Sequence, residues 1–347
     1  MNISRLLLCL MLAITMVLPM ACQAEGFTYT TTSMKDIDLT NIPEKYQEFF
    51  QYAELTIPIP GLKENFIPQG VCHLPGEDWI IVAGYRSDGG RSALICLDRT
   101  TGELVKEVHL NQVDGSAYKG HAGGVCATDK HIYVSNASHL YRISLETFRA
   151  LPESSTCAFE EAIPVPVNSS YCAYSDGVVW VGEFQYGTDY KTDATHNYTH
   201  ENGVNKAWTC GYIITDETEN GLKADVMAGG VAVPDYILST PASIQGCYVT
   251  PDAIYMSKSY GRNNASAMYK YENVLKNDPD ATVQLHGREI PLWVLQRSVM
   301  EKELTMPPMS EGICMVENGL YVLFESAAIK YSNCPYPLDE FPVLKGF

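Results

Sequence analysis

The chain has 347 residues, enough for one large domain or two ordinary ones and for a hydrophobic core that needs no disulfides. Hydrophobic residues make up 46% and charged residues 19%, which is typical of a globular protein and excludes a disordered, collagen-like or coiled-coil chain. The 41 acidic against 24 basic residues give a net charge of −17, and no run of Lys and Arg offers the basic face that binding to nucleic acid or an anionic membrane requires.

Residues 1–24 have the pattern of a secretory signal peptide. Arg5 precedes a short apolar run at 6–17, and residues 22–24 place small side chains at the −3 and −1 positions of a cleavage site. The run is too short for a stable membrane span. The alternative is a bacterial lipoprotein cut before Cys22, although Pro19 stands where that motif requires Leu. The sequence therefore predicts a secreted, cell-surface or periplasmic protein, with a lipid anchor at Cys22 as the alternative.

A unit of two β-strands repeats five times from residue 69 onward. Its first strand begins with a motif of the type Gln-Gly-Val-Cys, which occurs at 69–72, 123–126, 169–172, 245–248 and 311–314. A second β-rich run follows, nine residues after the second motif position, and covers 79–82, 132–134, 178–181, 254–256 and 320–323. Turn residues separate the two strands, and a third strand is predicted in most units, at 93–97, 140–143, 268–271 and 328–331.

This repeat predicts an all-β fold, a β-propeller of five four-stranded blades. The units start 54, 46, 76 and 66 residues apart, which suits ordinary blades of about 40–50 residues with insertions. A sixth blade is the alternative if the long third unit contains one, and an irregular β-sandwich is a further alternative. The last unit lacks a fourth strand, and the alternating stretch 54–60 is expected to supply it and close the ring. The predicted organisation is a signal peptide at 1–24, a lead-in at 25–51 and one propeller domain at 52–347.

Nine cysteines follow the predicted signal peptide, an odd number that leaves at least one thiol unpaired. Four of them share one position on the predicted innermost strands: Cys72, Cys126, Cys172 and Cys314. Equivalent positions of neighbouring blades are expected to lie beyond the ~7 Å Cα limit for a disulfide, so we interpret these residues as small buried hydrophobes that fill the centre of the ring. The sequence contains no Cys-x-x-Cys pair, which is the spacing that would indicate a metal site. Any disulfide is expected among Cys96, Cys157, Cys210 and Cys334.

The candidate site follows from where polar residues fall on the repeat. The starts of the predicted innermost strands carry Gln69, His121, Ser169, Gln245 and Glu311. The ends of the second strands carry Tyr85, Arg86, Asn136, Glu183, Tyr260, Arg262 and Glu325. Because the two strands of a unit are antiparallel, the two sets should meet at one end of the channel and form a polar mouth. Such a convergence of titratable groups in a concavity predicts a ligand-binding site, and the alternative is that these groups only bind one another and channel water.

An insertion at 185–206 is expected to lie over the same mouth as a lid. It is rich in Tyr and polar residues and contains His196 and His200, whose spacing would suit a metal only on a helix. The neighbouring residues favour a loop, so we interpret both as surface histidines.

The repeat units resemble those of gluconolactonase-like (SMP-30-type), NHL-repeat and quinoprotein-like propellers over about residues 52–332. The resemblance rests on Glu/Gln-Gly-Val motifs followed by hydrophobic-Tyr-Val strands, a pattern generic to the superfamily. In the lactonase family a Glu of a Glu-Gly motif, with Asn and Asp from other blades, holds a divalent metal that polarises the lactone. The resemblance implies Glu311 and Asn136 as metal ligands here. No Asp matches the third ligand, and the family's Glu lies near the start of the chain whereas Glu311 lies near its end.

The sequence leaves the choice between binding and catalysis open. It contains no Gly-x-Ser-x-Gly nucleophile elbow, no phosphate-binding P-loop, no His-Glu-x-x-His zinc motif and no EF-hand loop. The favoured function is that of a secreted, monomeric propeller that binds a small molecule, glycan or peptide at the mouth. One alternative is a metal-dependent hydrolase or lactonase, in which Glu311 with Glu183 or Glu325 holds a cation such as Ca²⁺ and His121 acts as base. The second alternative is a structural scaffold that uses its outer faces.

Overall fold

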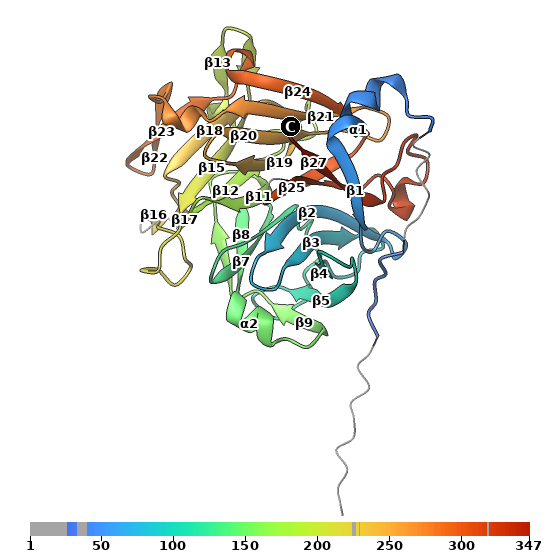
Figure 1. The fold of residues 1–347 in the computed structure, drawn as a ribbon. Helices are drawn as coiled ribbons and strands as arrows, with labels where there is room; N and C mark the ends of the chain where they lie inside the picture. Colours follow the sequence, from blue (N-terminus) through green and yellow to red (C-terminus); the bar gives the residue numbers. More distant parts are fainter. Residues whose placement is uncertain (1–25, 33–39, 224–226, 229, 318) are drawn as a thin grey trace, which may run out of the picture.

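Five short strands line the axis of the computed structural model, which describes residues 26–32, 40–223, 227, 228, 230–317 and 319–347. These innermost strands are β2 (Phe66–Leu74), β6 (Gly124–Ala127), β11 (Ser169–Ser175), β19 (Ile244–Val249) and β25 (Ser310–Val316). Each contacts the next, and β25 contacts β2, so the ring is closed. Each is also the inner edge of its own sheet (Figure 1). The protein is a five-bladed β-propeller, as the repeat predicted. The predicted signal peptide and Cys22 lie outside the described residues.

The first two blades follow the predicted strand order. Blade 1 contains β2, β3 (Trp79–Arg86), β4 (Ala93–Asp98) and β5 (Leu104–Asn111), with β9 (Ser154–Ala158) added parallel to β5. Blade 2 contains β6, β7 (His131–Asn136), β8 (His139–Ser144) and β10 (Glu161–Pro164). The helix α2 (Leu145–Ala150) connects β8 to β9.

The long third and fourth units extend blade 3 instead of adding a sixth blade. Blade 3 contains β11, β12 (Val178–Glu183), β15 (Ala207–Ile213) and β18 (Tyr236–Thr240), and its outer edge continues into β23 (Arg288–Val294) and β22 (Ala281–Leu285). Blade 4 contains β19, β20 (Ala253–Lys258), β21 (Ser266–Glu272) and β24 (Met300–Met306). Two small hairpins take up further insertions: β13 (Tyr198–His200) with β14 (Gly203–Asn205), and β16 (Met227–Ala228) with β17 (Val231–Ala232).

The two ends of the chain close the ring in blade 5. Its strands are β25, β26 (Gly319–Phe324), β27 (Glu340–Lys345) and, outermost, the N-terminal β1 (Ala53–Pro58). The antiparallel pairing of β1 with β27 runs from Ala53 opposite Leu344 to Pro58 opposite Glu340. Figure 1 shows the blue β1 beside the red β27. The predicted closure by the stretch 54–60 is therefore confirmed. Ahead of β1 lie η1 (Glu44–Tyr46) and α1 (Gln47–Tyr52).

The third strand predicted for the last unit, at 328–331, is wrong. This segment contains the 3-10 turn η5 (Ile329–Tyr331), whose Tyr331 amide donates locally to the Ala328 carbonyl at 2.7 Å. The edge of β26 is occupied instead by β27. The segment is thus free of the sheet and projects toward one end of the channel. The remaining 3-10 turns are η2 (Ala194–His196), η3 (Val274–Lys276) and η4 (Arg297–Val299).

Glycine in the repeated motif lets the innermost strands approach closely. A Cβ added at Gly124 would lie 2.2 Å from the backbone nitrogen of Cys172, and one added at Gly70 would lie 2.6 Å from the Cα of Gly124. Any side chain would push the neighbouring blades apart at the narrowest part of the ring. Glycine is therefore required at these two positions, whereas the equivalent position of blade 3 accommodates Ser170.

No disulfide links the nine cysteines of the described residues, and all nine are buried. None of Cys96, Cys157, Cys210 and Cys334 therefore forms the disulfide that the sequence allowed. Within the same residues, no helix is long and apolar enough to cross a membrane.

Candidate functional site

A concavity of about 530 Å³ opens at the end of the channel where the innermost strands begin, and we call it the mouth. Side chains from all five blades line it, because every innermost strand starts here and every second strand ends here. The predicted residues that line the mouth are Gln69, Tyr85, His121, Asn136, Ser169, Gln245, Tyr260, Arg262, Glu311 and Glu325. The antiparallel pairing within each blade thus brings most of the predicted set together.

Arg86 does not line the mouth. It follows Tyr85 on β3, and successive side chains of a strand point to opposite faces of the sheet. Arg86 instead donates from Nε to Oδ1 of Asp88 at 3.0 Å and lies over the ring of Tyr29. Its charge is neutralised by Asp88 away from the channel.

Glu183 does not line the mouth either, because it is buried beneath the insertion. Its Oε1 accepts a hydrogen bond from the Trp208 amide at 3.0 Å and lies 2.6 Å from Nδ1 of His196. Its Oε2 accepts from the Asn168 amide at 3.3 Å. Glu183 therefore anchors the insertion to the wall of blade 3.

Two carboxyl groups meet in the mouth. Glu311 and Glu325 are hydrogen-bonded to each other, and Gln245 Nε2 donates to Glu311 at 3.2 Å while Gln69 Nε2 donates to Glu325 at 2.9 Å. Burial, together with the charge of Glu325, raises the pKa of Glu311 well above its ordinary value. Burial also raises the pKa of Glu325, to about 7. The pair therefore holds at least one proton at neutral pH.

Two cations at the mouth form no salt bridge with a carboxylate of the described residues, although Lys330 interacts electrostatically with Glu325. Lys330 Nζ donates to the Tyr85 hydroxyl at 2.8 Å, and Arg262 donates to Oδ1 of Asn333 at 2.8 Å while its guanidinium lies over the ring of Tyr331. Among the described residues, neither has a carboxylate oxygen within 4.0 Å. Six arginines elsewhere do have one: Arg86, Arg99, Arg142, Arg149, Arg288 and Arg297.

His121 is a neutral side chain in the mouth. Its ring stacks on Tyr85 with the centroids 4.5 Å apart, and its backbone amide donates to Oδ1 of Asn136 at 2.9 Å. The residue is open to the concavity, yet its deep position and the nearby charge of Lys330 lower the pKa of the imidazole to about 4. At neutral pH the ring is a hydrogen-bonding group without charge.

The insertion reaches the predicted end of the channel, where Tyr190 lines the mouth, and its role as a lid stays a prediction. Tyr186 stacks on Tyr260 with ring centroids 3.5 Å apart, and Tyr190 packs edge-on against Phe184, which lines the mouth together with Tyr190. The interpretation of His196 as a surface histidine is wrong. Its ring is buried and stacks on that of Trp208 with the centroids 3.8 Å apart. The contact of its Nδ1 with the buried Glu183 carboxylate stabilises this position.

Lys330 and Tyr331 also line the mouth, and neither was among the predicted site residues. Their segment alternates in a way that favours a strand, and a strand there would lie within blade 5. The signal that could have found them is the charged Lys330 in the middle of an otherwise apolar and aromatic stretch.

The mouth does not fit the divalent metal that the lactonase resemblance implied. No three His, Cys, Asp or Glu side chains of the described residues come together as metal ligands. Glu311 is hydrogen-bonded to Glu325 and Gln245, and Asn136 Oδ1 accepts from the backbone of His121. The oxygen atoms of these residues are thus engaged with one another and with the backbone, and they do not surround a cation.

No protein-family model matches the sequence, and no curated protein matches it. Among solved structures, the chain is similar to a GH43_1 enzyme from Xanthomonas citri, with 11% identity over 87% of this chain and 92% of that chain and a TM-score of 0.45. It is also similar to the glutaminyl cyclase of Myxococcus xanthus, with 10% identity over 78% and 91% of the two chains and a TM-score of 0.37. For BamB from Moraxella catarrhalis the identity is 10%, the coverage 80% and 85%, and the TM-score 0.32. Similarities this distant assign no activity to the chain.

Proposed function

We propose that the protein binds a small hydroxylated anion, of the chemical class of an acidic sugar, in the mouth of its channel. The observation that carries the proposal is a pair of cations, Arg262 and Lys330, that form no salt bridge with any carboxylate of the described residues. In a protein of net charge −17, carboxylates are abundant, yet these two charges meet none of the described ones within salt-bridge distance. A guanidinium binds a carboxylate through two parallel hydrogen bonds, so Arg262 is suited to the anionic group.

The rest of the mouth suits the hydroxyl groups and apolar faces of such a ligand. Gln69, Gln245 and the carboxyl pair offer both donors and acceptors at its inner end. Tyr260 and Tyr190 offer flat apolar surfaces at its outer end. The volume of about 530 Å³ lies within the range of small-molecule sites. The leader-like sequence at 1–24 supports export, so we place this binding outside the cytoplasm.

The test is calorimetric binding of two acidic sugars, glucuronate and galacturonate, against the neutral glucose and galactose. The acidic sugars should bind more tightly, and Arg262→Gln and Lys330→Met should each weaken their binding. A hydrogen bond to a charged group contributes about 1.5–3 kcal/mol, so the expected loss is roughly 10- to 100-fold for each variant.

A matched control is Arg91→Gln. Arg91 also donates to an asparagine, Asn111, at 2.9 Å, but it lies outside the mouth. This variant should bind as the wild type does. Equal binding of neutral and acidic sugars, or an equal loss in Arg91→Gln, would reject the proposal.

A further inference from the structure

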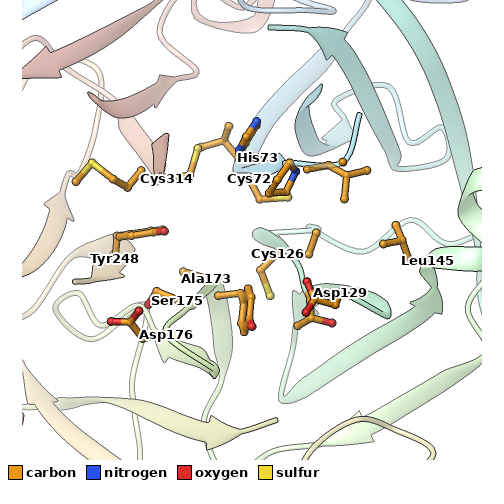
Figure 2. Close-up of a pocket in the computed structure, with 18 of the residues that line it drawn as sticks. Cys72, His73, Cys126, Asp129, Leu145, Ala173, Ser175, Asp176, Tyr248 and Cys314 are labelled. Atoms are coloured by element: carbon orange, nitrogen blue, oxygen red, sulfur yellow. The ribbon is translucent and has the colours of Figure 1, made fainter. Parts of the chain in front are cut away.

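A second cavity, of about 360 Å³, lies at the opposite end of the channel, where the innermost strands end, and we call it the far cavity. Three of the four cysteines at the shared repeat position line it: Cys72, Cys126 and Cys314. They are buried, as predicted, but they border an opening and do not simply fill the centre of the ring (Figure 2). The channel therefore has a second concavity, which the proposed function does not use.

The wall of the far cavity is mainly apolar and partly aromatic. Its apolar side chains include Val71, Leu74, Leu145, Ile313 and Met315. Two half-buried aromatic rings, Tyr174 and Tyr248, complete it, and Figure 2 shows Tyr248 pointing into the opening. Such a wall suits the apolar part of a ligand and leaves few partners for N–H groups.

Two aspartates give the rim of the far cavity a negative charge. Asp129 and Asp176 line the cavity and are exposed (Figure 2). Among the described residues, neither has a Lys, Arg or His nitrogen within 4.0 Å. Lys130, the neighbour of Asp129 in the chain, pairs with Asp216 instead. Both rim carboxylates are thus free to attract a cation.

The basic side chains that line the far cavity do not offset this charge. His73 lies 2.8 Å from Asp78, and Arg149 is paired with Glu77. Each of them therefore has its own acidic partner, and the charge left over at the cavity is that of the two aspartates.

One polar group of the wall lacks a partner. Ser175 is 7% exposed, and its hydroxyl has no hydrogen-bond partner among the described residues. Buried polar groups are normally hydrogen-bonded, so a ligand that carries a hydroxyl group would supply the missing partner.

We propose that the far cavity binds a small quaternary ammonium ion, a trimethylammonium compound of the choline type. A trimethylammonium group is positively charged yet has no N–H to donate, so it suits an apolar wall below an acidic rim. The faces of Tyr174 and Tyr248 attract such a cation through their negative π-electron density. A metal ion fits less well, because no three His, Cys, Asp or Glu side chains of the described residues converge as ligands.

The test is a calorimetric titration of the purified protein with choline and with its uncharged isostere, 3,3-dimethylbutan-1-ol. Choline should bind at one site per chain, and the isostere at least about 10-fold more weakly, because only choline carries the charge that the rings and the rim attract. Higher ionic strength should weaken the binding of choline, since the two aspartates are exposed. Equal affinities for the two compounds, or no binding of choline, would overturn the proposal.

Variants of the aromatic wall locate the site. Tyr248→Leu should weaken the binding of choline roughly 3- to 30-fold, whereas Tyr248→Phe keeps the aromatic face and should bind as the wild type does. An equal loss in both variants would contradict the role of the ring.

Variants of the rim do not disturb the core and decide the question if Tyr248→Leu fails to fold. Asp176→Asn should weaken the binding of choline about 2- to 5-fold. The matched control is Asp278→Asn, an exposed aspartate outside the cavity, which should leave it unchanged. Equal affinities in these two variants would count against the assignment. Arg262→Gln, at the mouth, should also leave it unchanged, and a loss there would place choline in the mouth and overturn the proposal.

Discussion

The carboxyl pair of Glu311 and Glu325 couples protonation to folding at the scale of single residues. The pKa of Glu325 rises from an ordinary 4.5 to about 7 because the folded protein buries it. Between these two values the folded chain keeps a proton that the unfolded chain releases. The contribution of Glu325 to the free energy of unfolding should therefore fall as the pH rises from about 4.5 to about 7, whereas His121, whose pKa is lowered to about 4, contributes in the opposite direction up to its ordinary 6.5. The pKa of Glu311 is raised as well, so this group adds to the decline.

Urea unfolding at pH 5 and pH 8 measures this effect. Glu325→Gln should lose much of the difference between the two pH values, because it removes one titrating group and relieves the repulsion on Glu311. Glu103→Gln, an exposed carboxyl in the turn between β4 and β5, should keep the wild-type difference. Acids with lowered pKa values, such as Asp88 at about 2, titrate below this window and do not obscure it. An unchanged difference in Glu325→Gln would refute the prediction.

A site residue could be predicted only where its position in the repeat determines which way its side chain points. Gln69, Gln245 and Glu311 share one position, and the structure places all three in the mouth. Arg86 fails because it is one residue beyond the inward-facing Tyr85, and the alternation of a strand turns it away. The position of Lys330 could not be predicted, because it lies in the turn η5, which is not part of the repeat.

At the scale of elements, buried contacts of Glu183 and of Asn205, whose amide donates to the Ser239 carbonyl at 3.0 Å, attach the insertion to blade 3. Glu183 accepts backbone hydrogen bonds from Trp208 and Asn168 and contacts His196. In Glu183→Gln, the amide NH₂ faces a backbone N–H, so at least one buried donor loses its acceptor. A lost acceptor of this kind costs about 1–3 kcal/mol. The variant should therefore be less stable by about that amount, and the insertion should exchange its amide hydrogens faster.

Hydrogen exchange across 186–205 gives the readout, with innermost-strand amides as the internal reference. Glu201→Gln, in the exposed turn of the β13–β14 hairpin, is the matched control and should leave exchange unchanged. Equal exchange in Glu183→Gln and the wild type would show that other contacts hold the insertion.

Elements that repeat were predictable, and elements that depend on distant partners were not. The motif and its nine-residue offset located the two inner strands of every blade because each blade buries the same positions. The parallel strands β9 and β23 have no counterpart in the repeat, since each joins a blade edge that its own unit does not provide. The strand β27 lies after a long turn, so local alternation at 328–331 was mistaken for it.

For the molecule as a whole, the pairing of β1 with β27 makes the five blades one cooperative unit. Every blade packs on two neighbours, and blade 5 is complete only when the two ends of the chain pair. Ile57 of β1 is 7% exposed and packs into the cluster that joins blades 1, 4 and 5. Truncation of a buried Ile to Ala costs about 2–5 kcal/mol. Ile57→Ala should destabilise the entire propeller by that amount and not release blade 5 alone.

Chemical unfolding with two probes tests this cooperativity. Tryptophan fluorescence reports on blades 1 and 3 through Trp79, Trp180 and Trp208, whereas far-ultraviolet circular dichroism reports on all five blades. In Ile57→Ala both transitions should move together to lower urea, since a closed ring has no blade that can leave independently. The control is Glu54→Gln, on β1 like Ile57, which removes an exposed ion pair with Lys345 of β27. It should change the free energy of unfolding by no more than about 1 kcal/mol. A circular dichroism change that precedes the fluorescence change in Ile57→Ala would mean that blade 5 unfolds first and that the ring is not a single unit.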